Sequence, residues 1–388
     1  MQITPAKRVS EIKPYFFAKL SKVIETLKQE GKDIIRLDIG SPDLPPASDI
    51  IETLVEEARK PNMHGYGEPG GSFSLRNAMA TYYQNKFEVS VDPNEEVLSL
   101  IGSKEGIYNL SQVLLDPGDT VILPDPCYPV YPVGPMITNS KTYYMPLLAE
   151  NNFLPRFNDI PESVLREAKL IWLNYPNNPT GAIAPLAFFE EAVEIAKEYQ
   201  ILIAHDAPYL EVCFDGYQAP SLLQVPGAKE VAIEFNSLSK TYNMAGWRVG
   251  MAIGNPEVIR LLRILKSQMD SSHFKPIMKA AEAALLGDQS WVKERNLIYQ
   301  QRRDIIVNTL QGLGFTVEKP RAALYIWAKI PDQWQDAVEY CEVMLLETGV
   351  SMTPGIVYGK SGERYIRISL VTPSERIEEA MERIRALS

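Results

Sequence analysis

The feature that most constrains this chain is the alternation of short apolar runs with longer amphipathic stretches. The runs are apolar over their whole length, as in strands that are buried on both faces of a sheet. The stretches between them show helical periodicity, for example 185–199 and 256–268. This order predicts βα units and an α/β fold whose mostly parallel sheet is flanked by helices. The candidate strands are 34–39, 97–101, 120–123, 170–173, 201–204, 231–235 and 249–253.

The order of predicted helices and strands changes after about residue 271. A long helical pattern, 290–311, ends at two glycines and is followed by short strands, a helix, another strand and a closing helix from Pro373. This order predicts a smaller α+β domain. A chain of 388 residues is also too long for one ordinary core. We expect an N-terminal arm with part of the small domain in 1–45, a large domain in 46–275 and a small C-terminal domain in 276–388.

Composition excludes several classes of protein. The formal net charge is −10, so nucleic acid is not expected as a partner. The sequence shows neither a signal-peptide core nor an apolar run long enough to span a membrane. The three cysteines lie far apart, and the three histidines lack metal-ligand spacing. We expect a reduced, cytoplasmic protein without a metal.

Polar side chains follow several of the candidate strands at the point where each strand ends. Asn174, Asp206, Ser237 and Lys240 each occupy such a position. Open α/β sheets bind ligands at the carboxyl edge of their strands. The four residues therefore predict a functional site at that edge.

The segment 236–250 carries the clearest chemistry. A strand leads to Lys240, which lies between two short hydroxyl-bearing stretches, and Arg248 follows eight residues later, before the next strand. A partly desolvated lysine is a good amine nucleophile for a Schiff base with an aldehyde, and an arginine at the same edge suits a phosphate. On this segment alone, a surface lysine and a solvated arginine remain an equal alternative.

Further motifs favour a functional role for Lys240 and Arg248, because together they resemble a known family. The segments 174–181, 204–209 and 236–250, with an early 38–43 turn and a late 364–369 strand, resemble the fold-type I pyridoxal-phosphate enzymes, specifically the class I/II aminotransferases. The resemblance covers essentially the whole chain. The residues at 102–106, 128–131 and 239–244 are similar to those of the LL-diaminopimelate aminotransferase subgroup, whereas the residues at 64–70 differ from the usual sequence of that subgroup.

The resemblance implies pyridoxal 5'-phosphate as the cofactor. Lys240 looks like the lysine that binds it and later moves the substrate proton. Asp206 looks like the partner of the pyridine nitrogen, although a lone Asp after a strand could also cap a helix. Tyr209 and Asn178 look like donors to the ring hydroxyl oxygen.

For the phosphate group, the resemblance points to Ser103, Lys104, Ser237 and Arg248. The first two lie where a strand joins a helix, whose free N–H groups suit an anion. In this position the family relies mainly on the backbone, which weakens the case for Lys104. Tyr128 resembles the aromatic that stacks on the pyridine ring, with a core tyrosine as the alternative.

The substrate residues follow from the same resemblance. Arg367 lies in an apolar strand and fits the α-carboxylate of an amino acid through two parallel hydrogen bonds. Gly40 would let the backbone approach the substrate, beside Asn178. Tyr66 resembles the tyrosine that reaches the cofactor of a neighbouring subunit, which implies a homodimer with shared active sites.

The expected reaction moves an amino group from an L-amino acid to a 2-oxo acid. The same Lys, Asp and Arg set could also serve a β- or γ-elimination or a cyclisation, because these reactions share their first step. A DNA-binding regulator built on this fold is not expected, since the first motif strand begins near Ile34. Whether a second arginine binds a distal carboxylate is open, with Arg36, Arg76 and Arg263 as candidates.

Overall fold

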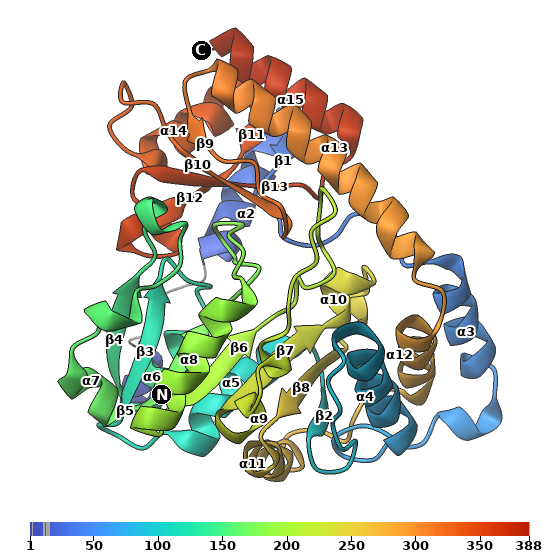
Figure 1. Ribbon diagram of the computed structural model, residues 1–388. Helices are drawn as coiled ribbons and strands as arrows, with labels where there is room; N and C mark the ends of the chain where they lie inside the picture. The colour runs from blue at the N-terminus through green and yellow to red at the C-terminus, as the bar shows by residue number, and fades with distance from the viewer. Residues whose placement is uncertain (2, 11, 13–15, 388) are drawn as a thin grey trace.

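The structure is a computed structural model, and it describes residues 1, 3–10, 12 and 16–387. Its largest sheet has seven strands, and only β8 runs antiparallel to its neighbours. The inner strands are buried along almost their whole length because helices cover both faces of the sheet (Figure 1). In order across the sheet, from edge to edge, its seven strands are β2 (Val97–Leu100), β8 (Gly250–Gly254), β7 (Ala232–Ser237), β6 (Leu202–Asp206), β5 (Ala168–Leu173), β3 (Thr120–Asp125) and β4 (Lys141–Pro146).

Alternate residues of these strands face two separate apolar cores. One core is formed with α5 (Ser103–Leu114) and α11 (Pro256–Lys266). The other is formed with α4 (Phe73–Phe87), α8 (Leu186–Tyr199) and α12 (Lys275–Leu286). The remaining helices of this part are α3 (Ser48–Ala58), α6 (Val133–Thr138), α7 (Glu162–Glu167), α9 (Ala228–Val231) and α10 (Leu238–Thr241).

A second, antiparallel sheet lies beyond the carboxyl edge of the first. Its order is β12 (Thr353–Pro354), β13 (Tyr365–Ser369), β10 (Tyr325–Lys329) and β9 (Thr316–Val317). A two-stranded parallel sheet beside it joins β1 (Ile35–Arg36) to β11 (Val350–Ser351). The helices around these sheets are α2 (Phe16–Gln29), α13 (Ser290–Gly312), α14 (Ala337–Val343) and α15 (Ser374–Leu387).

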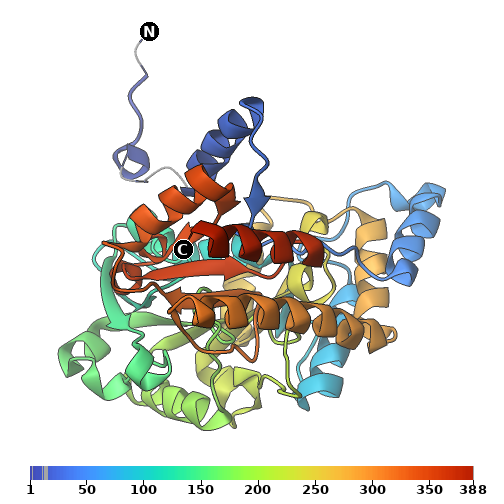
Figure 2. The ribbon, with the colours of Figure 1, turned by 90° about the horizontal axis from the view of Figure 1, so that it is seen from above.

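The two ends of the chain meet in this second unit. Figure 1 shows α2 and β1, in blue, among the orange and red C-terminal elements, and α13 and α15 lie side by side in both ribbon views (Figure 2). The first turn of α13 packs in a core of the large sheet, whereas its later turns pack in the core of the small sheets. Helix α13 thus spans the two parts of the molecule.

The fold class expected from the sequence is confirmed, and two strands differ. The expected strand 34–39 is reduced to two residues, and it pairs with β11 rather than joining the large sheet. The edge strand β4 was missed because its Lys, Thr and Tyr side chains are largely exposed and lack an apolar run. The domain boundaries given above stay a prediction.

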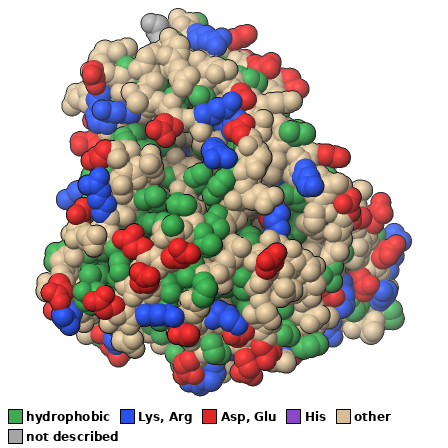
Figure 3. Space-filling view, viewed as in Figure 1, with side chains coloured by type: hydrophobic (Ala, Val, Ile, Leu, Met, Phe, Trp, Pro, Cys, Tyr) green, Lys and Arg blue, Asp and Glu red, His purple; other side chains and the backbone are tan. Residues whose placement is uncertain are grey.

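Acidic and basic side chains are scattered over the face seen in Figure 3 rather than gathered into a patch of one sign. No helix in the described part of the chain is long and apolar enough to cross a bilayer.

Candidate active site

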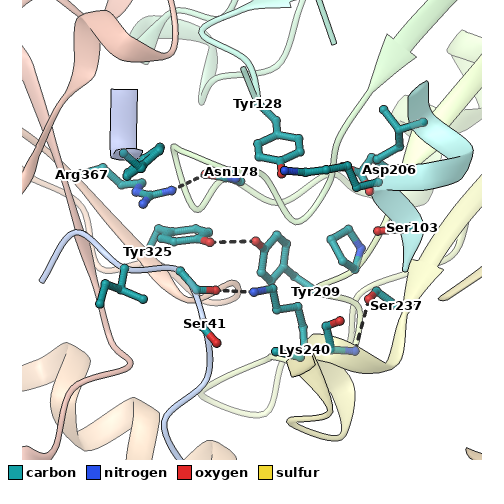
Figure 4. Close-up of a pocket in the computed structure, with 18 of the residues that line it drawn as sticks. Ser41, Ser103, Tyr128, Asn178, Asp206, Tyr209, Ser237, Lys240, Tyr325 and Arg367 are labelled. Atoms are coloured by element: carbon teal, nitrogen blue, oxygen red, sulfur yellow. Dashed lines mark hydrogen bonds between the residues drawn. The ribbon is translucent and has the colours of Figure 1, made fainter. Parts of the chain in front are cut away.

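A cavity of about 580 Å³ opens where strands β6 and β7 end, and the small sheet closes it from the other side. A volume of this size is typical of sites for small molecules and cofactors. Every predicted site residue except Tyr66 lines it (Figure 4). These residues are Gly40, Ser103, Lys104, Tyr128, Asn178, Asp206, Tyr209, Ser237, Lys240, Arg248 and Arg367.

Lys240 lies on the short helix α10, directly after β7, and points into the cavity. Its Nζ donates a hydrogen bond to the carbonyl oxygen of Gly40. Burial lowers the pKa of Lys240, and the charges of Arg367 and Arg248 lower it further. A lowered pKa leaves more of the amine neutral at neutral pH, as an attack on a carbonyl carbon requires.

Asp206 is the last residue of β6 and is buried. Its Oδ2 accepts a hydrogen bond of 2.7 Å from the hydroxyl of Tyr131, whereas its buried Oδ1 has no hydrogen-bond partner among the described residues. Burial raises the pKa of this carboxyl to about 6, although the Tyr131 hydrogen bond opposes the rise. A buried oxygen without a partner is costly, so this position calls for a donor from a ligand, such as a protonated ring nitrogen.

The opposite end of the cavity suits an anion. Helix α5 begins at Ser103, after Gly102 with a φ of 77°, and its first N–H groups have no partners within the helix. A Cβ at Gly102 would collide with the guanidinium of Arg248, so the glycine allows that close approach. Ser239 adds a buried hydroxyl without a partner among the described residues. Cation, hydroxyl and N–H groups together fit a phosphate.

The aromatic wall of the cavity is Tyr128. The Nζ of Lys104 lies 5.6 Å from the centroid of its ring. Burial lowers the pKa of Lys104, and the nearby charge of Arg248 lowers it further. Tyr131 packs edge-on against Tyr128 and stacks on Trp172 at 4.8 Å. This stacking holds the wall rigid beside the cavity.

Arg367 is buried on β13, where its Nη1 donates to Asn178 at 3.1 Å and its Nη2 to the carbonyl of Asp38 at 2.8 Å. Its Nε has no partner among the described residues, and the ion pairs of those residues do not include it. A buried guanidinium without an anion is costly, and the carboxylate of a ligand would supply the missing partner.

Tyr131, Ser239 and Tyr325 belong to the site and were not predicted from the sequence. Ser239 and Tyr131 lie within recognised motifs, so their positions could have been noticed. Tyr325 lies in an apolar run that reads as core, and nothing in the sequence marks it. Tyr66 is 89% exposed and does not line the cavity of its own chain.

Comparisons with known proteins agree with this geometry. The model of the family "Aminotransferase class I and II" matches residues 32–384. A relative from Moorella thermoacetica named LL-diaminopimelate aminotransferase is 49% identical, over 98% of this chain and 97% of that protein. One from Dehalococcoides mccartyi with the same name is 47% identical over the same shares.

Solved structures give the same result. Substrate-bound BacF from Bacillus subtilis superposes with a TM-score of 0.94 at 38% identity, over 100% of this chain and 98% of that one. A probable N-succinyldiaminopimelate aminotransferase from Thermus thermophilus gives 0.90 at 35% identity, over 96% of this chain and 100% of that one. The chain therefore belongs to the class I and II aminotransferases, and it is an enzyme that depends on pyridoxal phosphate.

Proposed function

We propose that this aminotransferase uses Lys240 to bind the aldehyde of pyridoxal phosphate and a diamino dicarboxylic acid as a substrate. One observation carries the first part of the proposal: the buried amine of Lys240 shares a cavity with the unpartnered Oδ1 of Asp206. The cofactor needs an amine at its aldehyde and an acid at its ring nitrogen.

The other cofactor contacts follow from the two ends of the cavity. Tyr128 would lie on the ring face, with Tyr209 and Asn178 at the ring hydroxyl. The phosphate would lie at the start of α5, held by Ser103, Lys104, Ser237 and Arg248. All of these residues line the cavity, and the unpartnered hydroxyl of Ser239 supports the same placement.

When bound, pyridoxal phosphate supplies an electron-withdrawing ring that stabilises the negative charge left on Cα after loss of its proton. Asp206 would hold a proton on the ring nitrogen, and that proton would strengthen the withdrawal. Lys240 would act as the base that accepts the proton from Cα of the substrate and as the acid that returns it. Arg367 binds the α-carboxylate and thereby presents the Cα–H bond to the lysine.

The substrate class rests on the relatives and on one arginine. The relatives named LL-diaminopimelate aminotransferase are 44–49% identical to this chain. Of the three arginines left open by the sequence, only Arg36 lines the cavity. Arg76 donates hydrogen bonds to backbone carbonyls, including that of Pro93. Arg263 donates hydrogen bonds to the backbone carbonyls of Asn94 and Val97. Arg36 would bind the distal carboxylate of the substrate.

A homodimer with shared sites is part of the proposal. Tyr66 is almost fully exposed and lies outside the cavity of its own chain, as expected of a residue that serves a neighbouring subunit. Three large apolar side chains are also exposed: Phe73 at the start of α4, Phe274 directly before α12 and Leu286 at the end of α12. A cytoplasmic location stays a prediction.

A donor screen tests the function. Holoenzyme is mixed with single amino acids, and the absorbance of the bound cofactor is followed without an acceptor. We expect LL-diaminopimelate to convert the cofactor to its amine form, with one equivalent of 2-oxo acid released. Release of ammonia with return of the starting spectrum would instead show elimination, which the named relatives do not support.

A further inference from the structure

Tyr325 lies at the centre of the site, although none of the roles above involves it. It is the first residue of β10, it is buried, and it pairs with Ser369 of β13 across the small sheet. Arg367 is two residues from Ser369 on that strand, and its guanidinium carbon lies 4.2 Å from the centroid of the Tyr325 ring. The Tyr325 ring therefore makes a cation–π contact with the guanidinium of Arg367, the group proposed to bind the substrate carboxylate.

The hydroxyl of Tyr325 reaches a second part of the site. It lies 3.0 Å from the hydroxyl of Tyr209, and both groups are buried (Figure 4). The two rings meet edge-on with their centroids 5.6 Å apart. This contact fixes the position of the Tyr209 hydroxyl, which would bind the ring oxygen of the cofactor.

Gly40 makes room for this arrangement. A Cβ at that position would collide with the Tyr325 hydroxyl. The carbonyl of the same glycine accepts the hydrogen bond from Lys240. The role of Gly40 is therefore to let the Tyr325 hydroxyl pack against the backbone that holds the lysine.

The surroundings of the two phenols shift their pKa values in opposite directions. Burial raises the pKa of the Tyr325 phenol, but the charges of Lys240 and Arg367 and the hydrogen bond with Tyr209 together outweigh burial, and the pKa lies below its ordinary value. Burial raises the pKa of Tyr209 well above its ordinary value. Either hydroxyl of the pair can donate, so the contact fixes the position of the Tyr209 hydroxyl whichever group carries the shared proton.

We propose that Tyr325 is a positioning residue with two separable parts: its hydroxyl holds the Tyr209 hydroxyl in place at the cavity, and its ring supports the Arg367 guanidinium. The inference rests on the roles proposed above for Tyr209 and Arg367. The hydroxyl oxygen of Tyr325 then affects the pH midpoint of the bound cofactor, and the ring affects the KM of the amino acid.

Substitutions in the holoenzyme separate the two parts. Tyr325→Phe removes the hydroxyl and keeps the ring, while Tyr325→Leu and Tyr325→Met remove both. The readouts are the pH midpoint of the bound-cofactor absorbance and the KM of the amino acid. Tyr358→Phe is the matched control, because Tyr358 also lies over Arg367, at 5.0 Å, and its ring stays in place.

For Tyr325→Phe we expect the midpoint to rise by about half a pH unit or more, since a Tyr209 hydroxyl that is no longer held in place stabilises the ring oxyanion less. The KM should stay within about twofold of wild type. For Tyr325→Leu and Tyr325→Met we expect the same midpoint shift and a KM raised about fivefold or more. Either of these two variants suffices if the other does not fold. Tyr358→Phe should leave the midpoint in place.

Tyr209→Phe separates failure of this inference from failure of the proposed function. If Tyr209→Phe moves the midpoint and Tyr325→Phe does not, the inference is wrong and the role of Tyr209 stands. If neither variant moves it, the role of Tyr209 is wrong and the hydroxyl part of the inference falls with it. An unchanged KM in both Tyr325→Leu and Tyr325→Met overturns the ring part.

Discussion

The hydroxyl of Tyr131 donates a 2.7 Å hydrogen bond to Oδ2 of Asp206, and it thereby leaves only Oδ1 of that carboxyl free to face a ligand. Tyr131 is in turn held by stacking on Trp172. The carboxyl is thus fixed in one orientation before any cofactor binds. A fixed acceptor loses less entropy on binding than a mobile one.

Tyr131→Phe should raise the pKa of Asp206 beyond about 6, because the lost hydrogen bond stabilises the carboxylate. A higher pKa leaves more of the carboxyl protonated at neutral pH and weakens its hold on the ring-nitrogen proton. We expect the acidic limb of the kcat profile to move upward by about half a pH unit or more. Tyr340→Phe, in the core of the small sheets, is the control. An unmoved limb would contradict the role of Tyr131.

Asp206→Asn tests the acid itself. The variant should still bind the cofactor but lose about 100-fold or more in kcat, since the ring nitrogen is no longer held as a cation. In wild type, cofactor affinity should fall as pH drops through about 6, because the carboxyl then becomes protonated and neutral. The phosphate also titrates near pH 6, so the slope that remains in Asp206→Asn measures the phosphate alone. A rate close to wild type would mean that Asp206 is structural.

Lys240→Ala should abolish turnover and leave the cofactor bound without a covalent link. The measurement is the mass of the protein after borohydride reduction, which traps a lysine-bound cofactor. Lys104→Ala is the matched control, because Lys104 also lines the cavity, and it should keep the added mass. Cofactor mass retained in Lys240→Ala would overturn the assignment of the lysine.

Arg36 tests the substrate class. Its Nε and Nη2 pair with the carboxylate of Asp38 at 2.7 and 2.6 Å, which orients the guanidinium at the cavity wall, where its side chain is 22% exposed. Arg36→Met should raise KM about tenfold for a diamino dicarboxylic acid, and change it little for a monocarboxylic amino acid.

Controls separate binding from stability in that test. Arg36→Met leaves the buried Asp38 without its partner, so Tm is measured in parallel and Arg36→Lys, which keeps the charge, is included. Arg263→Lys replaces an arginine outside the cavity and should leave KM unchanged for both substrates. Equal KM changes for the two substrates would show that Arg36 does not bind the distal carboxylate.

Shared sites predict complementation between inactive subunits. Lys240→Ala chains are co-expressed with chains in which Tyr66 is replaced by alanine. If Tyr66 serves the neighbouring subunit, a mixed dimer has one site with both defects and one intact site. Random pairing then restores about a quarter of the sites. The measurement is the specific activity of the co-expressed protein against that of each variant expressed alone, and no gain over the separate variants would contradict a shared site.

The fold class followed from apolar runs and helical periodicity because both are local in sequence. The strand ends at Asp206 and Ser237 were also readable, since parallel strands place their carboxyl ends at one edge. Strand β4 was not readable, because an exposed edge strand lacks the buried faces that give the others their pattern. The pairing of β1 with β11 depends on residues more than 300 positions apart, and no local signal encodes it.

By itself the sequence identified the candidate reactive groups: an amine and an acid that follow or end strands, and two guanidinium groups, one before a strand and one within a strand. Only the tertiary structure decided which oxygen of Asp206 stays free, that Arg36 rather than Arg76 or Arg263 lines the cavity, and that Tyr325 lies between Tyr209 and Arg367. The reason is physical. A residue's chemistry is carried by its own side chain, whereas its orientation and its free lone pairs depend on neighbours that packing brings from distant parts of the chain.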